Sequence, residues 1–139
     1  MKAVYPVYFT KSDEGILIEV PDFGILAEEK DMSDAICTAR GLIEQTCVSL
    51  ENANKDIPAP SELKALDTKK AVYANTGETV ISFVDIDSSE YRRKTDTKTV
   101  RRNVALPSWL NYEADKAGVN VSRILQEALV EELHLERKL

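Results

Sequence analysis

Arginine and asparagine stand two residues apart, at Arg101 and Asn103, in a basic stretch of this 139-residue chain. Residues two apart in a β-strand point to the same side, so both side chains would project from one face. A guanidinium can donate two hydrogen bonds to a guanine edge, and a carboxamide can both donate to and accept from an adenine edge. The chemistry that this spacing offers is recognition of base edges.

A strand over residues 98–106 must position these side chains. Positions 100, 104 and 106 are apolar and predict a buried face, whereas Thr99, Arg101, Asn103 and Ala105 share the outward face. Arg102 falls on the buried parity, and its guanidinium must reach out to solvent. Two antiparallel copies of this strand would form a ribbon that fits the DNA major groove.

Two short helices are predicted after the strand. The first runs from Ser108 to about Lys116 and ends before Gly118, and the second runs from Val121 to about Leu133 with Asn120 as its cap. The second helix has an apolar stripe of Ile124, Leu125, Ala128, Leu129 and Leu133. One strand and two short helices cannot bury this surface alone. The pattern therefore predicts a two-fold symmetric homodimer that pairs the strands.

The preceding residues predict a small α+β domain over residues 1–87. Runs of β-branched and aromatic residues indicate strands at 4–10, 16–20, 23–27 and 79–85, and helical spacing of apolar residues indicates a helix from about Met32 to Glu51, capped by Asp31. The helix should cover one face of the sheet. Pro6 favours an edge or end position for the first strand. Residues 88–98 contain almost no apolar side chain and are predicted to be a linker.

Charge is distributed unevenly along the chain, whose net charge is -6. Residues 1–94 contain 11 basic and 17 acidic side chains, whereas residues 92–102 contain six basic side chains and one acidic one. A basic segment on an acidic protein can hold phosphate groups while the remainder repels them. This distribution suits local contact with nucleic acid.

The order of strand, Pro107, helix, Gly118 and capped helix resembles the ribbon-helix-helix repressors from Thr99 to Leu133. The resemblance implies base contacts from Arg101, Asn103 and Ala105, although alanine departs from the longer polar residue that is common at its position. It implies phosphate contacts at the strand and at the start of the second helix, from Lys98, Thr99, Asn120, Val121 and Ser122.

The stretch from Tyr5 to Thr10, then Gly15, then Glu19 to Phe23 and an acidic helix, looks like the HicB antitoxin family. That resemblance implies an N-terminal domain with a reduced ribonuclease H fold, which binds a small basic HicA-type toxin that cleaves RNA. It also implies that the dimer represses its own operon at an inverted-repeat operator. Candidate toxin contacts are Tyr8, Asp22 and Phe23, for which ordinary roles in the sheet and turn are the alternative.

Two other functions remain open from the sequence. The N-terminal domain of a repressor could sense a small molecule, or the acids of a ribonuclease H-like fold could hold metal ions for nuclease chemistry, which requires converging carboxylates. The available acids are Asp13, Asp22, Asp31, Asp34, Asp85 and Asp87. Most of them fall in turns or at a helix start, where solvation and capping explain them, so no catalytic residue, metal site or cofactor is expected.

The positions of the cysteines, the single histidine and the hydropathy pattern argue against a disulfide, histidine-based catalysis and a membrane-spanning segment. Cys37 and Cys47 fall ten residues apart on one predicted helix, about 15 Å along its axis, which is too far for a disulfide. His134 is the single histidine, so histidine-based triads are not expected. No apolar run approaches the roughly 20 residues that span a bilayer. A cytoplasmic protein without membrane contact is expected.

Overall fold

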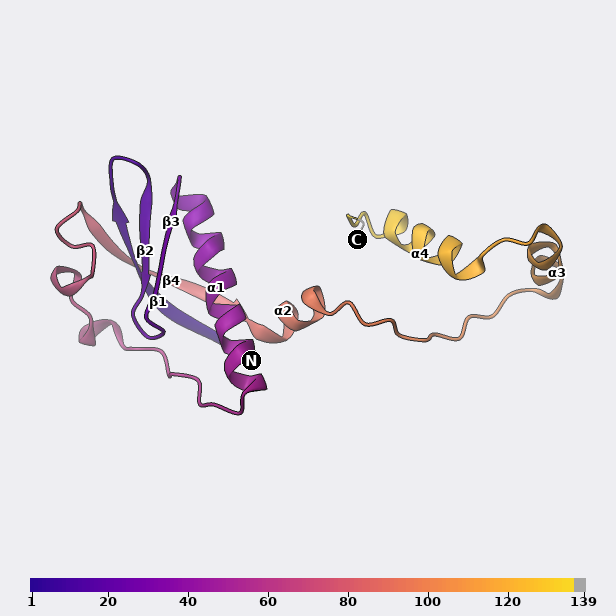
Figure 1. Cartoon of the computed structure of the whole chain (residues 1–139), viewed down its shortest axis with the longest axis horizontal. Coiled ribbons are helices and arrows are strands. Elements are labelled where there is room, and N and C mark those ends of the chain that lie inside the picture. Colours follow the sequence, from indigo (N-terminus) through magenta and orange to yellow (C-terminus); the bar gives the residue numbers. More distant parts are fainter. Residues whose placement is uncertain (137–139) are drawn as a thin grey trace. The chain divides into compact units, whose positions relative to one another are not determined.

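The computed structural model describes residues 1–136 and divides the chain into two units (Figure 1). Unit 1 comprises residues 1–97, and unit 2 begins at Lys98. Unit 1 contains the sheet and its covering helix, and unit 2 contains two short helices.

Unit 1 contains an antiparallel four-stranded sheet covered on one face by a helix. The strands are β1 (Lys2–Lys11), β2 (Ile16–Val20), β3 (Ile25–Glu29) and β4 (Thr79–Asp87), in the order β3-β2-β1-β4. The helix is α1 (Met32–Asn52), which lies between β3 and β4 in the chain. The α+β class and the predicted order of three strands, a helix and a strand are confirmed.

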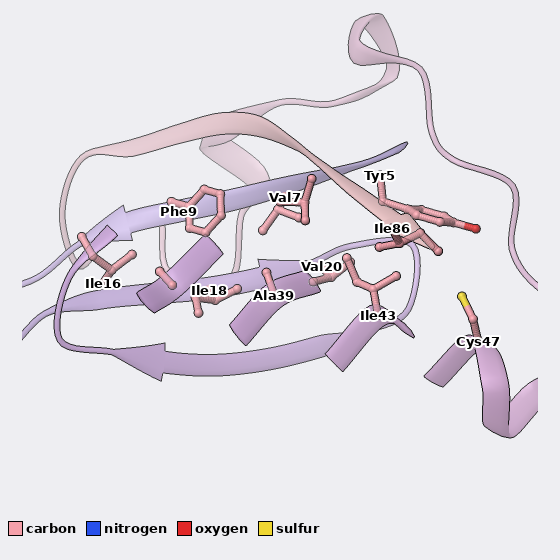
Figure 2. Packing of buried hydrophobic residues seen from close by; sticks show 12 residues of the cluster. Tyr5, Val7, Phe9, Ile16, Ile18, Val20, Ala39, Ile43, Cys47 and Ile86 are labelled. Carbon is pink, nitrogen blue, oxygen red and sulfur yellow. The ribbon is translucent and has the colours of Figure 1, made fainter. Parts of the chain in front are cut away.

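The core lies between α1 and the sheet (Figure 2). Alternate residues of each strand face the helix because side chains of a strand alternate between faces. The buried cluster comprises Tyr5, Val7, Phe9, Ile16, Ile18, Val20, Ala35, Ala39, Ile43, Cys47, Val84 and Ile86. The predicted cap is confirmed, since the Asp31 side chain accepts a hydrogen bond from the backbone N–H of Asp34 at 2.8 Å and so fixes the start of α1.

Pro6 lies in the middle of β1, which is a central strand of the sheet. The β1–β2 ladder begins at the pair Tyr8 and Glu19. Continuing the same register would place Pro6 opposite Pro21, and neither residue has an N–H to donate. The ladder therefore stops there, and Pro6 has a neighbouring strand only on the β4 side. The predicted edge position is thus wrong for the strand, although Pro6 itself lies where the strand lacks a second partner.

A long segment, residues 53–78, crosses the sheet face opposite α1 and is called the strap here. It contains two short 3₁₀ helices, η1 (Leu63–Ala65) and η2 (Thr68–Lys70). The Tyr8 hydroxyl donates to the carbonyl of Asp67 at 3.4 Å, and the backbone N–H of Val72 donates to Glu19 at 2.8 Å. The strap side chain Leu66 lies beside Tyr8 and Ile81. The second face of the sheet is therefore covered by irregular chain.

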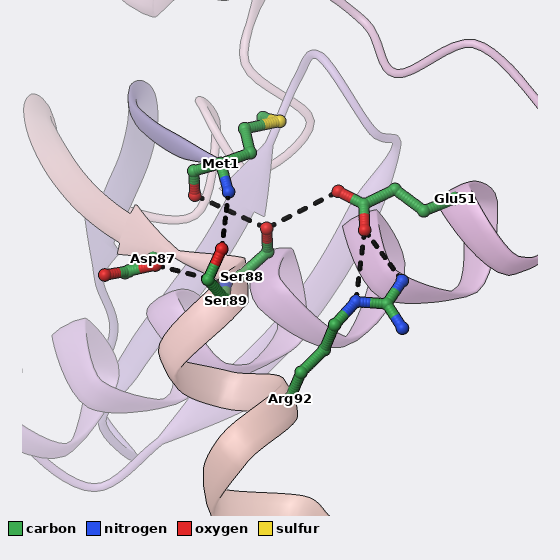
Figure 3. A network of polar contacts seen from close by, with 6 residues as sticks. All are labelled: Met1, Glu51, Asp87, Ser88, Ser89 and Arg92. Carbon is green, nitrogen blue, oxygen red and sulfur yellow. Dashed lines mark hydrogen bonds and ion pairs between the residues drawn. The ribbon is translucent and has the colours of Figure 1, made fainter.

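Helix α2 (Ser88–Thr95) occupies most of the stretch that the sequence predicted to be a linker, residues 88–98. The Asp87 side chain caps it by accepting from the backbone N–H groups of Ser89 and Glu90. Polar contacts link α2 to α1 and to Met1. Arg92 donates to Glu51 of α1 at 2.7 Å, and the hydroxyl of Ser88 donates to the carbonyl of Met1 (Figure 3). The shortage of apolar residues was thus a poor guide to this helix.

Unit 2 contains α3 (Ser108–Ala117) and α4 (Val121–Glu132), close to their predicted bounds. Gly118 ends α3 in the left-handed conformation, with φ of 67°, as predicted. Asn120 caps α4 by accepting from the backbone N–H of Arg123. Residues 96–107 form no regular structure, so the strand predicted at 98–106 is absent from the single chain. A lone strand has no partner for its backbone groups, which explains this difference.

Both cysteines of the chain lie on α1 and are free. Cys37 is exposed, whereas Cys47 is buried in the core, and this burial raises the pKa of the Cys47 thiol. The predicted absence of a bridge between them is confirmed. Within residues 1–136, no helix combines the length and the apolar character needed to cross a bilayer.

Candidate functional sites

The apolar side chains of unit 2 lie in solvent. No residue in the described part of this unit, 98–136, is buried, and Val100 is 84% exposed. On α4, Ile124 and Leu129 from the predicted stripe are about half exposed. Other exposed apolar residues are Val104, Leu106, Trp109, Leu110, Tyr112, Val119, Val121, Leu133 and Leu135. An apolar surface of this extent on so short a segment is typical of an interaction site.

The predicted base-reading residues Arg101, Asn103 and Ala105 are all exposed, as are Lys98 and Thr99 beside them. They lie on the irregular stretch that joins α2 to α3, before the helices of unit 2 begin. The single chain does not bring them together on one face. Pairing of two such stretches into a ribbon would impose the alternation that collects Arg101 and Asn103 on one side.

The start of α4 carries the predicted phosphate contacts Asn120, Val121 and Ser122. The Asn120 side chain is already engaged, because it accepts from the N–H of Arg123 at 3.1 Å. Val121 and Ser122 are exposed at the first turn, where helix N–H groups have no intrahelical partner. The geometry leaves backbone donors, rather than the asparagine side chain, free to meet an anion.

The three candidate toxin contacts have structural roles in unit 1. Tyr8 is 6% exposed, and its hydroxyl donates to the carbonyl of Asp67 in the strap at 3.4 Å. Asp22 accepts from both the N–H and the hydroxyl of Ser61. Phe23 packs edge-on against Tyr5, with ring centroids 4.8 Å apart. Tyr8 and Asp22 hold the strap, and burial raises the pKa of Tyr8.

The acids considered for metal binding also have structural partners. Asp31 and Asp87 cap α1 and α2, and Asp85 forms an ion pair with Arg40 at 2.9 Å. The Arg40 guanidinium lowers the pKa of Asp85, and the backbone N–H of Glu90 lowers the pKa of Asp87. Among residues 1–136, no three side chains of the metal-binding types are grouped so that they could share an ion.

Sequence reasoning missed the contacts between the strap and the sheet. Asp22 and Ser61 are 39 residues apart, and Tyr8 and Asp67 are 59 residues apart. No local pattern links such positions. By contrast, two local signals could have revealed α2, namely Asp87 as a cap and the pair Glu90 and Lys94 at helical spacing.

Comparison with known proteins identifies the fold. No protein-family model matches the chain, and no curated protein matches it. The chain is similar to a chain of a toxin–antitoxin complex from Streptococcus pneumoniae, with 21% identity and a TM-score of 0.60 over 95% of this chain and 99% of that one. It is also similar to the Burkholderia pseudomallei antitoxin HicB, with 23% identity and a TM-score of 0.50 over 94% and 96% of the two chains.

A third similar structure is the antitoxin HicB3, with 22% identity and a TM-score of 0.50 over 94% of this chain and 97% of that one. In each case the similarity spans nearly the full length of both proteins. The likeness to HicB antitoxins that the sequence indicated is therefore confirmed for the fold.

Proposed function

We propose that this chain is a HicB-type antitoxin. Unit 1 binds and neutralises a small RNA-cleaving HicA-type toxin, and unit 2 dimerises as a ribbon-helix-helix module that represses the operon encoding both proteins. The observation that carries this proposal is the fold shared with HicB antitoxins over 94% of the chain, which includes both units. The first similar structure is itself described as a toxin–antitoxin complex.

Dimerisation of unit 2 is supported by its exposed apolar side chains. Two copies can pair their 98–106 stretches and cover Val100, Val104 and Leu106, while Ile124 and Leu129 of each α4 pack against the other copy. A two-stranded pairing also satisfies the backbone groups that a lone strand leaves open. Association thus supplies the core that one copy lacks.

The proposed ribbon presents Arg101, Asn103 and Ala105 to base edges in the major groove of an inverted-repeat operator. Lys98 and Thr99, with the first-turn residues of α4 from Asn120 to Ser122, contact phosphates on either side. Arg92 and Lys94 pair with acidic side chains of unit 1. The other basic side chains of residues 92–102, which are Arg93, Lys98, Arg101 and Arg102, provide the local positive charge that an acidic chain needs to approach DNA.

Toxin binding is assigned to unit 1, which we propose to be the reduced ribonuclease H-like domain. Its excess of acidic side chains attracts a small basic protein and speeds association. Asp22 and Phe23 are half-buried at the turn after β2 and offer direct contacts, whereas Tyr8 acts through the strap that it holds. Asp31 and Asp87 cap helices and Asp85 forms an ion pair, and we propose that the chain is a regulator in the cytoplasm rather than an enzyme.

The DNA half of this proposal is tested by fluorescence anisotropy. The full chain is titrated into labelled DNA from immediately upstream of its gene, at two salt concentrations and with random-sequence competitor. We expect binding that survives the competitor and weakens with salt. Binding no tighter than that to random DNA would reduce unit 2 to a dimerisation module.

The toxin half is tested by co-expression with a HicA-type toxin. We expect one stable complex and loss of the toxin's RNA cleavage in the presence of the full chain. A Phe23→Ala variant should weaken this complex, whereas Val72→Ala, an exposed apolar position on the strap, serves as the matched control. Purification with a bound metabolite and no affinity for the toxin would favour the small-molecule sensor instead.

A further inference from the structure

Helix α2 ends in a basic turn, residues 92–94, whose three cations differ in their partners. Arg92 donates two hydrogen bonds to one carboxylate oxygen of Glu51 on α1, from Nε at 3.2 Å and from Nη2 at 2.7 Å (Figure 3). Lys94 pairs with Glu90, one turn earlier on α2, at 2.8 Å. Arg93 is exposed and forms no ion pair within residues 1–136. Unit 1 therefore neutralises two of these cations and leaves the third open.

The contact between Arg92 and Glu51 is exchangeable. The two side chains are 41% and 31% exposed, so water and other anions can reach both groups. An ion pair at this exposure contributes little to stability, because water solvates the separated charges. A guanidinium can donate two parallel hydrogen bonds to a phosphate as well as to a carboxylate. A phosphate brought close to α2 can therefore replace Glu51 on Arg92.

The length of chain between the basic turn and the proposed ribbon limits their separation. Five residues lead from Arg93 to Lys98, where the proposed ribbon begins, and they span at most about 17 Å. Duplex DNA carries one phosphate charge per about 1.7 Å of its axis, so about ten phosphates fall within that reach. Lys98, Arg101 and Arg102 are exposed and continue the positive charge into the ribbon. A duplex held by the ribbon thus offers phosphates to the basic turn.

We propose that the basic turn of α2 binds phosphates of the operator beside the bases that the ribbon reads, and that Glu51 competes with these phosphates for Arg92. Arg93 binds DNA directly, whereas Arg92 must first leave Glu51. Glu51 thus lowers the affinity of the chain for DNA until a phosphate takes its place. This inference rests on the proposed DNA binding by unit 2 and extends it to a surface of unit 1.

Charge favours DNA over the toxin as the partner of the basic turn. A small basic toxin would meet three like charges at residues 92–94, whereas the acidic remainder of unit 1 attracts it. Phosphates are the anions that DNA binding by unit 2 brings to this position, and each phosphate contact releases counterions. The DNA backbone is therefore the partner that fits this surface.

The salt dependence of operator binding tests the phosphate contact. The affinity of the full chain is measured by anisotropy over a range of salt concentrations for the wild type, Arg93→Ala and Lys70→Ala. Loss of one phosphate contact in Arg93→Ala should flatten the slope of log affinity against log salt by about 0.9, which weakens binding about eightfold at about 0.1 M salt. Operator and random DNA should be affected equally, since a phosphate carries no sequence information. Lys70→Ala removes the same charge from an exposed position of the strap and should change neither value.

Glu51→Gln tests the competition, because glutamine keeps the shape of the side chain and removes its charge. This variant should bind the operator about two- to fivefold more tightly, which is the factor that a partly exposed ion pair supplies. Glu28→Gln, at an exposed position of β3, is the matched control and should leave the affinity unchanged. In an Arg92→Ala background, Glu51→Gln should have no effect, because the side chain that Glu51 holds is gone. Circular dichroism of each variant checks that the fold is kept.

Three outcomes would overturn the proposal. Equal salt slopes for Arg93→Ala and Lys70→Ala would mean that the basic turn does not contact DNA. Equal affinities for Glu51→Gln and Glu28→Gln would mean that Glu51 does not compete. A flatter slope with RNA but not with the operator would assign the basic turn to RNA. Absence of specific operator binding by the wild type would refute the proposed function as well, whereas these three outcomes refute only the role of the basic turn.

Discussion

Unit 1 and unit 2 differ in where their apolar side chains lie. In unit 1, α1 and the sheet enclose a cluster that includes Tyr5, Phe9 and Ile43, each at most 1% exposed. In the described part of unit 2, no side chain is buried, although its helices carry as clear an apolar stripe. A stripe alone therefore does not indicate that a core exists within one chain.

The difference has a thermodynamic meaning. Unit 1 can be stable at any dilution because its core is intramolecular. In the proposed dimer, unit 2 buries its apolar surface only on association, so we expect its stability to depend on protein concentration. Under the proposed function, one chain combines a unit that has its own core with a unit that gains a core only in the dimer.

The largest effect is expected from a charge in the proposed interface of unit 2. Leu129→Asp would place a carboxylate in each half of a buried apolar contact, at a cost of several kcal/mol per ion. Light scattering should show loss of the unit 2 dimer, and specific DNA binding should disappear. Gln126→Asp, at an exposed polar position of α4 outside the apolar stripe, is the matched control. A Leu129→Asp chain that dimerises normally through unit 2 would remove the contrast between the units.

A core truncation in unit 1 should have a large effect of a different kind. Ile43 is fully buried, and Ile43→Ala should lower the free energy of unfolding of unit 1 by about 2–5 kcal/mol. Denaturation followed by circular dichroism should show this loss at every protein concentration. Cys37→Ala, at an exposed position of the same helix, should change the stability little. A concentration-dependent loss in Ile43→Ala would show that unit 1, too, depends on association.

A smaller effect is expected on specificity. Asn103→Ala should weaken binding to the operator by about 1–3 kcal/mol, because it removes a bidentate contact with adenine, and should leave folding intact. Anisotropy titrations with operator and random DNA measure the change. Asn111→Ala, on α3, is the matched control. Unchanged operator affinity in Asn103→Ala would refute the proposed strand register.

Helix α2, the last helix of unit 1, should respond weakly to loss of its contact with α1. Arg92→Ala removes the contact with Glu51, and because both side chains are partly exposed we expect at most about 1 kcal/mol. Hydrogen exchange should show faster opening of residues 88–95, with Arg93→Ala as the control. Equal exchange in the two variants would mean that other contacts hold α2.

The smallest effect concerns acid stability of unit 1. Arg40 lowers the pKa of Asp85, so the charged carboxylate contributes stability above the pKa of the unfolded chain, about 3.9, and this contribution is lost as pH falls through the lower folded value. Asp85→Asn should therefore flatten the pH dependence of unfolding below about pH 4. Identical acid profiles in the two proteins would show that the exposed pair contributes nothing.

Local patterns predicted most of the elements. The cap at Asp31, the glycine at 118 and the alternation in the strands each act within a few residues, and the corresponding elements formed at or near the expected positions. The third strand begins at Ile25 rather than at residue 23, because Gly24 continues the turn with a φ of 64°. Boundaries shifted where a turn residue governed the backbone.

Features that depend on residues far apart in the sequence, or on a second chain, could not be predicted. The strap owes its position to pairs such as Asp22 and Ser61, which no spacing rule connects. The strand predicted at 98–106 is irregular in the single chain, because a strand needs another strand beside it and one chain does not supply one. The same limit applies to the candidate sites, since Arg101 and Asn103 share a face only when a ribbon exists.

The two cysteines allow the opening of unit 1 to be measured by the rate of their reaction with a thiol reagent. Both lie on α1, and the chain has no other cysteine. Cys37 is exposed to solvent, whereas Cys47 is buried between α1 and the sheet. A thiol reagent should consume Cys37 at once and reach Cys47 only when α1 separates from the sheet. The rate of the second phase therefore measures how fast unit 1 opens in the native sequence, without a mutation. Because both cysteines lie in unit 1, this rate does not report on unit 2.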